Sequence, residues 1–137
     1  MELSVFADLL ATRGQRLLPG SHVVPVDVLV EQPDGTIAHF TARGTTIRLA
    51  LFDHDALSSI VLSTDCGCGK HHAPAGTART ALRASAVPLL ERVIDGRLAF
   101  GWTTHEAGLV RLAEAAGYYF ELLDMATVDD AAFATLP

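Results

Sequence analysis

Cysteine is scarce in this chain, and long apolar runs are absent from it. Only two of the 137 residues are cysteines, and a disulfide between them would close a very small, strained ring because one residue separates them. Half of the residues are apolar, yet no apolar stretch reaches the roughly eighteen residues that a membrane-spanning helix needs. The first residues also lack the basic segment and cleavage pattern of a signal peptide. We therefore expect a soluble, cytoplasmic protein with no membrane partner.

Basic side chains are few as well. Lysine and arginine together number 10, against 16 aspartates and glutamates, and the formal net charge is −6. The basic residues are scattered along the chain, whereas a protein that binds phosphate backbones usually concentrates them on one surface. The sequence therefore argues against nucleic acid as a partner.

The chain has no internal repeat, low-complexity tract or linker, so residues 1–137 are expected to form a single domain. Its N-terminal half predicts a helix followed by an antiparallel meander of four strands. Apolar residues at helical spacing indicate the helix, and dense β-branched residues separated by short turns indicate the strands. The expected helix spans residues 3–10, and the expected strands span residues 23–30, 36–43, 45–52 and 57–62.

The C-terminal half predicts mostly helix. Apolar spacing from residue 77 onward indicates one helix, and Pro88 inside it should kink or split that helix. Thr103-x-x-Glu106 matches a capping box, which would open a second helix that ends at Gly117. Residues 118–123 then predict a final strand, and residues 127–137 a short helix or a frayed end. Together these elements predict an α+β fold, mostly sheet first and mostly helix second.

The chemistry of the sequence is concentrated in the heptapeptide CGCGKHH, residues 66–72. It contains both cysteines of the chain and two of its six histidines. Thiolate sulfur and imidazole nitrogen are ligands that Zn²⁺ prefers, so we expect a zinc site in which Cys66 and Cys68 bind together with His71 or His72. Both histidines on one metal is the less favoured arrangement, because neighbouring side chains diverge. Cys66-Gly67-Cys68-Gly69 is similar to the opening of the short SEC-C zinc motif, whose closing cysteine and histidine pair this chain lacks.

Three local ligands leave the fourth position of a tetrahedral site open. His105 is the candidate from elsewhere in the chain, and a water molecule or a residue of a second chain would also complete the site. The turn at Asp53, His54 and Asp55 is a weaker source, because a meander places it at the opposite end of the sheet from the cysteines.

Several functions remain open on this basis. The favoured hypothesis is a mainly structural zinc site in a small binding or regulatory module. The alternatives are a zinc-dependent hydrolase with an open metal position, in which Glu106, Asp53 or Asp55 would be the general base, and a thiol-redox protein that uses Cys66 and Cys68. No catalytic residue is identified.

Aromatic and histidine residues outside the heptapeptide receive structural interpretations. The apolar composition, the N-terminal helix and the aromatic run at residues 118–120 suit a homodimer or another protein partner. His22 and His39 fall on predicted strands and are interpreted as half-buried or exposed residues without a functional role.

Overall fold

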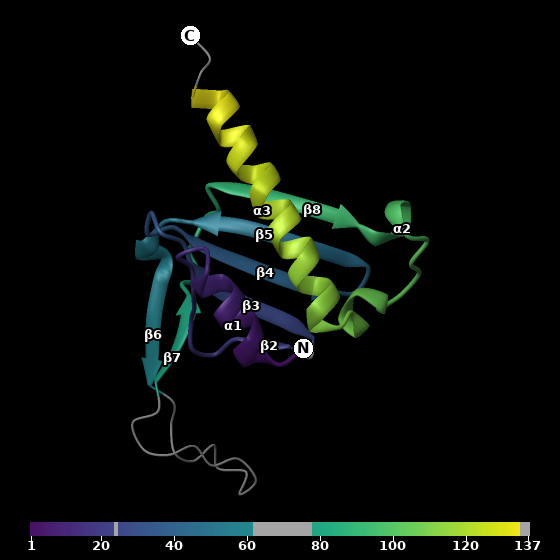
Figure 1. Ribbon diagram of the computed structural model, residues 1–137, viewed down its shortest axis with the longest axis horizontal. Coiled ribbons are helices and arrows are strands. Elements are labelled where there is room, and N and C mark those ends of the chain that lie inside the picture. Colours follow the sequence, from purple (N-terminus) through teal and green to yellow (C-terminus); the bar gives the residue numbers. More distant parts are fainter. Residues whose placement is uncertain (24, 62–77, 135–137) are drawn as a thin grey trace, which may run out of the picture.

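A computed structural model describes residues 1–23, 25–61 and 78–134 (Figure 1). The strands are β1 (Arg16–Leu17), β2 (His22–Val23), β3 (Val26–Glu31), β4 (Ile37–Arg43), β5 (Thr46–Phe52), β6 (Leu57–Val61), β7 (Ala78–Leu82) and β8 (Leu90–Asp95). The helical elements are α1 (Leu3–Ala11), η1 (His54–Ala56), α2 (Gly96–Ala99), η2 (Glu106–Leu109) and α3 (Leu112–Ala134). The mixture of helices with antiparallel strands confirms the α+β class.

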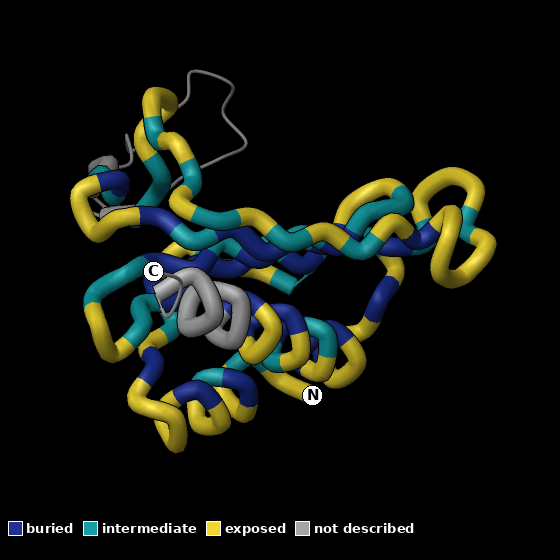
Figure 2. The backbone as a smooth tube through the Cα atoms, turned by 90° about the horizontal axis from the view of Figure 1, so that it is seen from above, coloured by how far each residue is buried: buried dark blue, intermediate teal, exposed yellow. Residues whose placement is uncertain are grey.

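Six strands form one antiparallel sheet, and the other two form a separate ribbon. The sheet has the order β1-β3-β4-β5-β8, with β2 also paired to β3, while β6 pairs with β7. Helices α1 and α3 cover one face of the sheet, which we call the helix face, and the β6–β7 ribbon lies against the other, which we call the open face (Figures 1 and 2).

The main core lies between the helix face and the two helices. Because side chains alternate along a strand, Val26, Val28 and Val30 of β3 all point to this side and are fully buried. Tyr119 of α3 is also fully buried and meets Phe40 edge to face, with ring centroids 5.6 Å apart. Helix α3 is placed by such contacts, and no helix in the described part of the chain is long and apolar enough to cross a membrane.

The open face carries a second, smaller apolar cluster. Leu29, Ile37 and Phe52 alternate with the residues of the main core and are buried on this side. Leu57 of β6 and Leu82 of β7 pack against them, which holds the base of the ribbon on the sheet. Next to this cluster, the open face carries the polar residues Asp27, His39 and Arg43.

Most of the N-terminal prediction is confirmed. The helix and the first three strands correspond to α1, β3, β4 and β5, and the tight turn between β3 and β4 places Gly35 at a φ of 88°. The predicted strand at residues 57–62 is present as β6, but the four-stranded meander is wrong. Strand β8 takes the place beside β5, and β6 leaves the sheet to pair with β7.

The predicted helix from residue 77 is wrong, since this part of the chain supplies β7 and β8. Pro88 lies between these strands, so there is no helix for it to kink, and Leu89 next to it donates its N–H to the carbonyl of Leu51 (2.7 Å). Side chains of β8 alternate between half-buried and exposed. A short run of apolar residues can match the helical period by chance. The segment forms a strand here because the edge of β5 is available for it to pair with.

The predicted final strand at residues 118–123 is also wrong, because these residues belong to α3. Gly117 does not end a helix but lies inside α3, which continues to Ala134 through most of the tail. The buried side chains of α3 keep helical spacing across Gly117, with Leu112 and Ala115 before it and Tyr119 after it. Burial along this stripe outweighs the roughly 1 kcal/mol that a glycine costs in a helix interior.

Candidate functional site

Cys66, Cys68, His71 and His72 lie outside the described residues, so the predicted ligand set stays a prediction. The strand residues on either side of this segment are described. Val61, the last residue of β6, and Ala78, the first residue of β7, are paired neighbours. The segment 62–77 therefore leaves and re-enters the same two-stranded ribbon.

His105, the predicted fourth ligand, lies beside the turn between β4 and β5. It precedes η2, and the N–H of Ala107 in that element donates to the carbonyl of Gly44 (2.9 Å). The chain enters the ribbon from Phe52, at the other end of β5, and a strand of seven residues is roughly 20 Å long. The fold therefore places His105 at the end of the sheet opposite the base of the ribbon.

The turn at Asp53, His54 and Asp55 lies at the base of the ribbon. Residues 54–56 form η1 and lead directly into β6 at Leu57, whereas the cysteine segment follows the far end of β6. The meander on which the sequence argument about this turn rested is wrong, and the position of the cysteines relative to the turn stays a prediction. Nε2 of His54 lies 3.2 Å from Oε2 of Glu31.

Glu106, one of the candidate general bases, is committed to the backbone before η2. Its carboxylate accepts hydrogen bonds from the N–H groups of Thr103 (2.7 Å), Thr104 (2.9 Å) and His105 (3.1 Å). These bonds, that of Thr104 first, lower the pKa of Glu106 to about 2. A general base works best when its pKa lies near the working pH, so the capping interpretation fits this glutamate better than a catalytic one.

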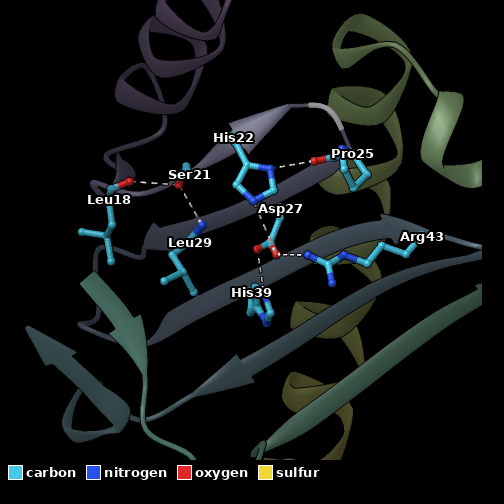
Figure 3. A network of polar contacts seen from close by, with 8 residues as sticks. All are labelled: Leu18, Ser21, His22, Pro25, Asp27, Leu29, His39 and Arg43. Carbon is cyan, nitrogen blue, oxygen red and sulfur yellow. Dashed lines mark hydrogen bonds and ion pairs between the residues drawn. The ribbon is translucent and has the colours of Figure 1, made fainter. Parts of the chain in front are cut away.

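A polar cluster that the sequence analysis did not identify lies on the open face (Figure 3). Asp27 of β3 accepts a hydrogen bond from Nε2 of His39 on β4 (2.9 Å to Oδ1) and another from Nη2 of Arg43 (2.7 Å to Oδ2). His22 of β2 brings its Nε2 to 4.0 Å from Oδ2 of the same carboxylate. The hydrogen bond from His39, followed by the positive charges around it, lowers the pKa of Asp27 in spite of its partial burial.

Strand register brings these residues together. Asp27 is paired directly with Thr41, so His39 and Arg43 lie at the two diagonal positions on the same side of β4. His22 is paired with Asp27 on the other side, across β2 and β3. Polar residues at alternating positions were the available signal, but it becomes specific only when the register of two strand pairs is known.

A pocket of about 160 Å³ lies beside this cluster, between the sheet and the ribbon. Its lining residues are Gly20, Ser21, His22, Asp27, Leu29, His39, Thr80, Ala81 and Leu82. Ser21 is not placed as a nucleophile, since its hydroxyl donates to the carbonyl of Leu18 (2.9 Å) and accepts from the N–H of Leu29 (3.1 Å). Ser21 fixes the turn that carries His22 instead of forming a triad with it.

Within the described ranges, no group of three or more histidine, cysteine, aspartate or glutamate side chains is arranged to hold a metal ion. In comparisons with known proteins, the chain matches no protein family, no curated sequence and no solved structure.

Proposed function

We propose that this chain is a small zinc-binding protein of the cytoplasm, in which Cys66, Cys68 and either His71 or His72 hold a mainly structural zinc ion. The proposed role of the whole is that of a binding or regulatory module. Four donors within seven residues support the site, and a reducing compartment would keep both thiols available as ligands.

The pairing of Val61 with Ala78 is the observation that carries this proposal. Paired residues of antiparallel strands have their Cα atoms about 5 Å apart, so Val61 and Ala78 hold the two ends of the connecting segment close together. Metal ligands in a segment with its ends held together would lose less chain entropy on binding than ligands on a free segment, because part of the closure cost has already been met.

A bound metal would also stabilise the ribbon. Two antiparallel strands alone are marginally stable in water, and the apolar contacts described for this ribbon, at Leu57 and Leu82, are at its base. A tetrahedral zinc in the connecting segment would stabilise the opposite end. This is the chemistry of a closed structural site, which contributes directly to folding.

Elemental analysis of protein purified without a metal-affinity step tests the site. We expect about one zinc per chain in the natural protein and its loss in Cys66→Ser and Cys68→Ser, by the ligand count. Lys70→Gln is the matched control, since it changes a residue of the same heptapeptide that cannot be a ligand in its charged form, and it should keep the zinc. A natural protein without stoichiometric metal would contradict the proposal, and His105→Ala tests the fourth ligand.

Amide hydrogen exchange separates the structural role from the alternatives. If zinc is structural, a chelator should remove protection from the amides of β6 and β7 while β3, β4 and β5 keep theirs. A thiol-redox pair holds no metal, so it predicts that a chelator leaves the protection of the ribbon unchanged. The low pKa of Glu106 weighs against the hydrolase in which this residue is the base.

We also propose that the chain self-associates, with β8 as the interface. This strand is the last in the order of the sheet, and Val93, Leu98 and Phe100 in and after it are 50%, 87% and 44% exposed. The aromatic run at residues 118–120 no longer supports a dimer, because Tyr119 is buried in the core. Light scattering after size exclusion should give a dimer, and Val93→Lys should give a monomer; a monomeric natural protein would rule the interface out.

A further inference from the structure

The pocket on the open face contains two imidazoles whose tautomers are determined by their partners. Nδ1 of His22 lies 2.9 Å from the carbonyl oxygen of Pro25, and Nε2 of His39 lies 2.9 Å from Oδ1 of Asp27. Carbonyl and carboxylate oxygens only accept, so each of these nitrogens must carry the hydrogen. In the neutral imidazoles the other nitrogens, Nε2 of His22 and Nδ1 of His39, are therefore acceptors.

This assignment leaves two acceptors facing each other. Nε2 of His22 and Oδ2 of Asp27 are 4.0 Å apart, too far for a direct hydrogen bond (Figure 3). At a donor atom about 2.9 Å from both acceptors, the angle between the two hydrogen bonds would be about 90°. The N–H bonds of an ammonium group are about 109° apart, so each hydrogen bond would deviate from linearity by about 10°. The gap thus has the dimensions of a site for a donor with at least two hydrogens.

We propose that this pocket binds a small primary alkylammonium ligand, with its nitrogen between His22 and Asp27 and its alkyl chain against Leu29 and Leu82. Asp27 supplies the negative charge, and the two leucines supply an apolar wall on the sheet and on β7. The pocket volume of about 160 Å³ suits a chain of a few carbons. This site is made entirely of described residues and does not depend on the zinc proposal.

Removing the charge of Arg43 should change the affinity of a cation and of an anion in opposite directions. Its guanidinium donates to Oδ2 of Asp27, the same oxygen that the ammonium would use, so the two cations compete. Removing the Arg43 charge should therefore strengthen binding of an ammonium. The same change should weaken binding of an anion, which would rely on Arg43 as its counter-charge.

The experiment is an NMR titration of the full chain with n-butylammonium at about pH 8, where imidazoles are ordinarily neutral. We expect saturable chemical-shift changes of the Leu29 and Leu82 amides with n-butylammonium and none with acetate. The affinity for n-butylammonium should rise severalfold in Arg43→Gln and fall about tenfold in His22→Ala. Arg16→Gln is the matched control, because Arg16 pairs with Glu31 on the same face outside the pocket and its loss should leave the affinity unchanged. The absence of saturable shifts, equal shifts with acetate, or weaker binding in Arg43→Gln would each overturn the proposal.

Discussion

The hydroxyl of Tyr119 provides the sharpest test of the core. It donates to Oε1 of Gln15 (2.6 Å) and accepts from Nε2 of Gln32 (3.0 Å), within a site where Tyr119 is fully buried and Gln15 is 7% exposed. This burial also raises the pKa of Tyr119. Tyr119→Phe keeps the ring and its aromatic contacts but leaves Oε1 of Gln15 without its hydrogen-bond donor.

The expected loss in the free energy of unfolding follows from the buried Oε1 of Gln15 that is left without a donor. An unsatisfied buried polar group costs about 1–3 kcal/mol, more than the net contribution of an ordinary hydrogen bond. For 137 residues the entropy of unfolding is about 0.3 kcal/mol per kelvin, so the melting temperature should fall by about 3–10 °C. In Gln15→Leu combined with Tyr119→Phe both partners are apolar, and the double variant should lose less stability than the two single changes together.

Urea denaturation of the three variants measures these free energies. Tyr118→Phe is the matched control, since Tyr118 is only partly buried beside the same core, and its loss should stay within about 0.5 kcal/mol. A Tyr119→Phe variant as stable as the natural protein, or strictly additive single changes, would refute the reasoning.

Two further predictions follow from individual contacts. Gly96→Ala would place a Cβ against the Trp102 ring and 2.7 Å from the Thr45 carbonyl, and it should lower the free energy of unfolding by about 1–3 kcal/mol or more. Gly117→Ala in α3 would place a Cβ with nothing within 4 Å, and it should raise the free energy of unfolding by about 0.5–1 kcal/mol. Urea midpoints that shift in the same direction for both variants would contradict this pair of predictions. Glu106 has a pKa of about 2, below its ordinary 4.5, so its carboxylate stabilises the fold above pH 4.5 and loses that effect as the pH falls toward 2. Glu106→Gln should have a lower melting temperature than the natural protein above pH 4.5, and this difference should shrink as the pH falls from 4.5 toward 2. A difference in melting temperature that does not depend on pH would show that the charge of the Glu106 carboxylate does not cause it.

Local pattern predicted the N-terminal half of the fold well. The helix at α1 and the strands β3, β4 and β5 follow from apolar spacing, β-branched residues and a Pro-Asp-Gly turn, all of which act within a few residues. The same rules failed after residue 77, where the apolar run before and after Pro88 fits either period. There the decision came from a distant partner, the open edge of β5.

The candidate sites divide in the same way. The cysteine and histidine heptapeptide is visible as a cluster because its members are neighbours in the chain, and it stays a prediction. The Asp27 cluster joins β2, β3 and β4, and no spacing in the sequence distinguishes His39 from an ordinary strand histidine. Its recognition needed the strand register.

The sequence by itself determined the α+β class, the first helix and strands, and a dense set of potential zinc ligands. Each of these depends on residues close together in the chain, where local sterics, burial period and ligand chemistry act. Only the tertiary structure decided that β8 completes the sheet, that residues 118–123 are helical, and that His22, Asp27 and His39 share one pocket. Those outcomes depend on which distant surfaces are available to bury apolar groups and to pair backbone groups, and that is a property of the folded chain as a whole.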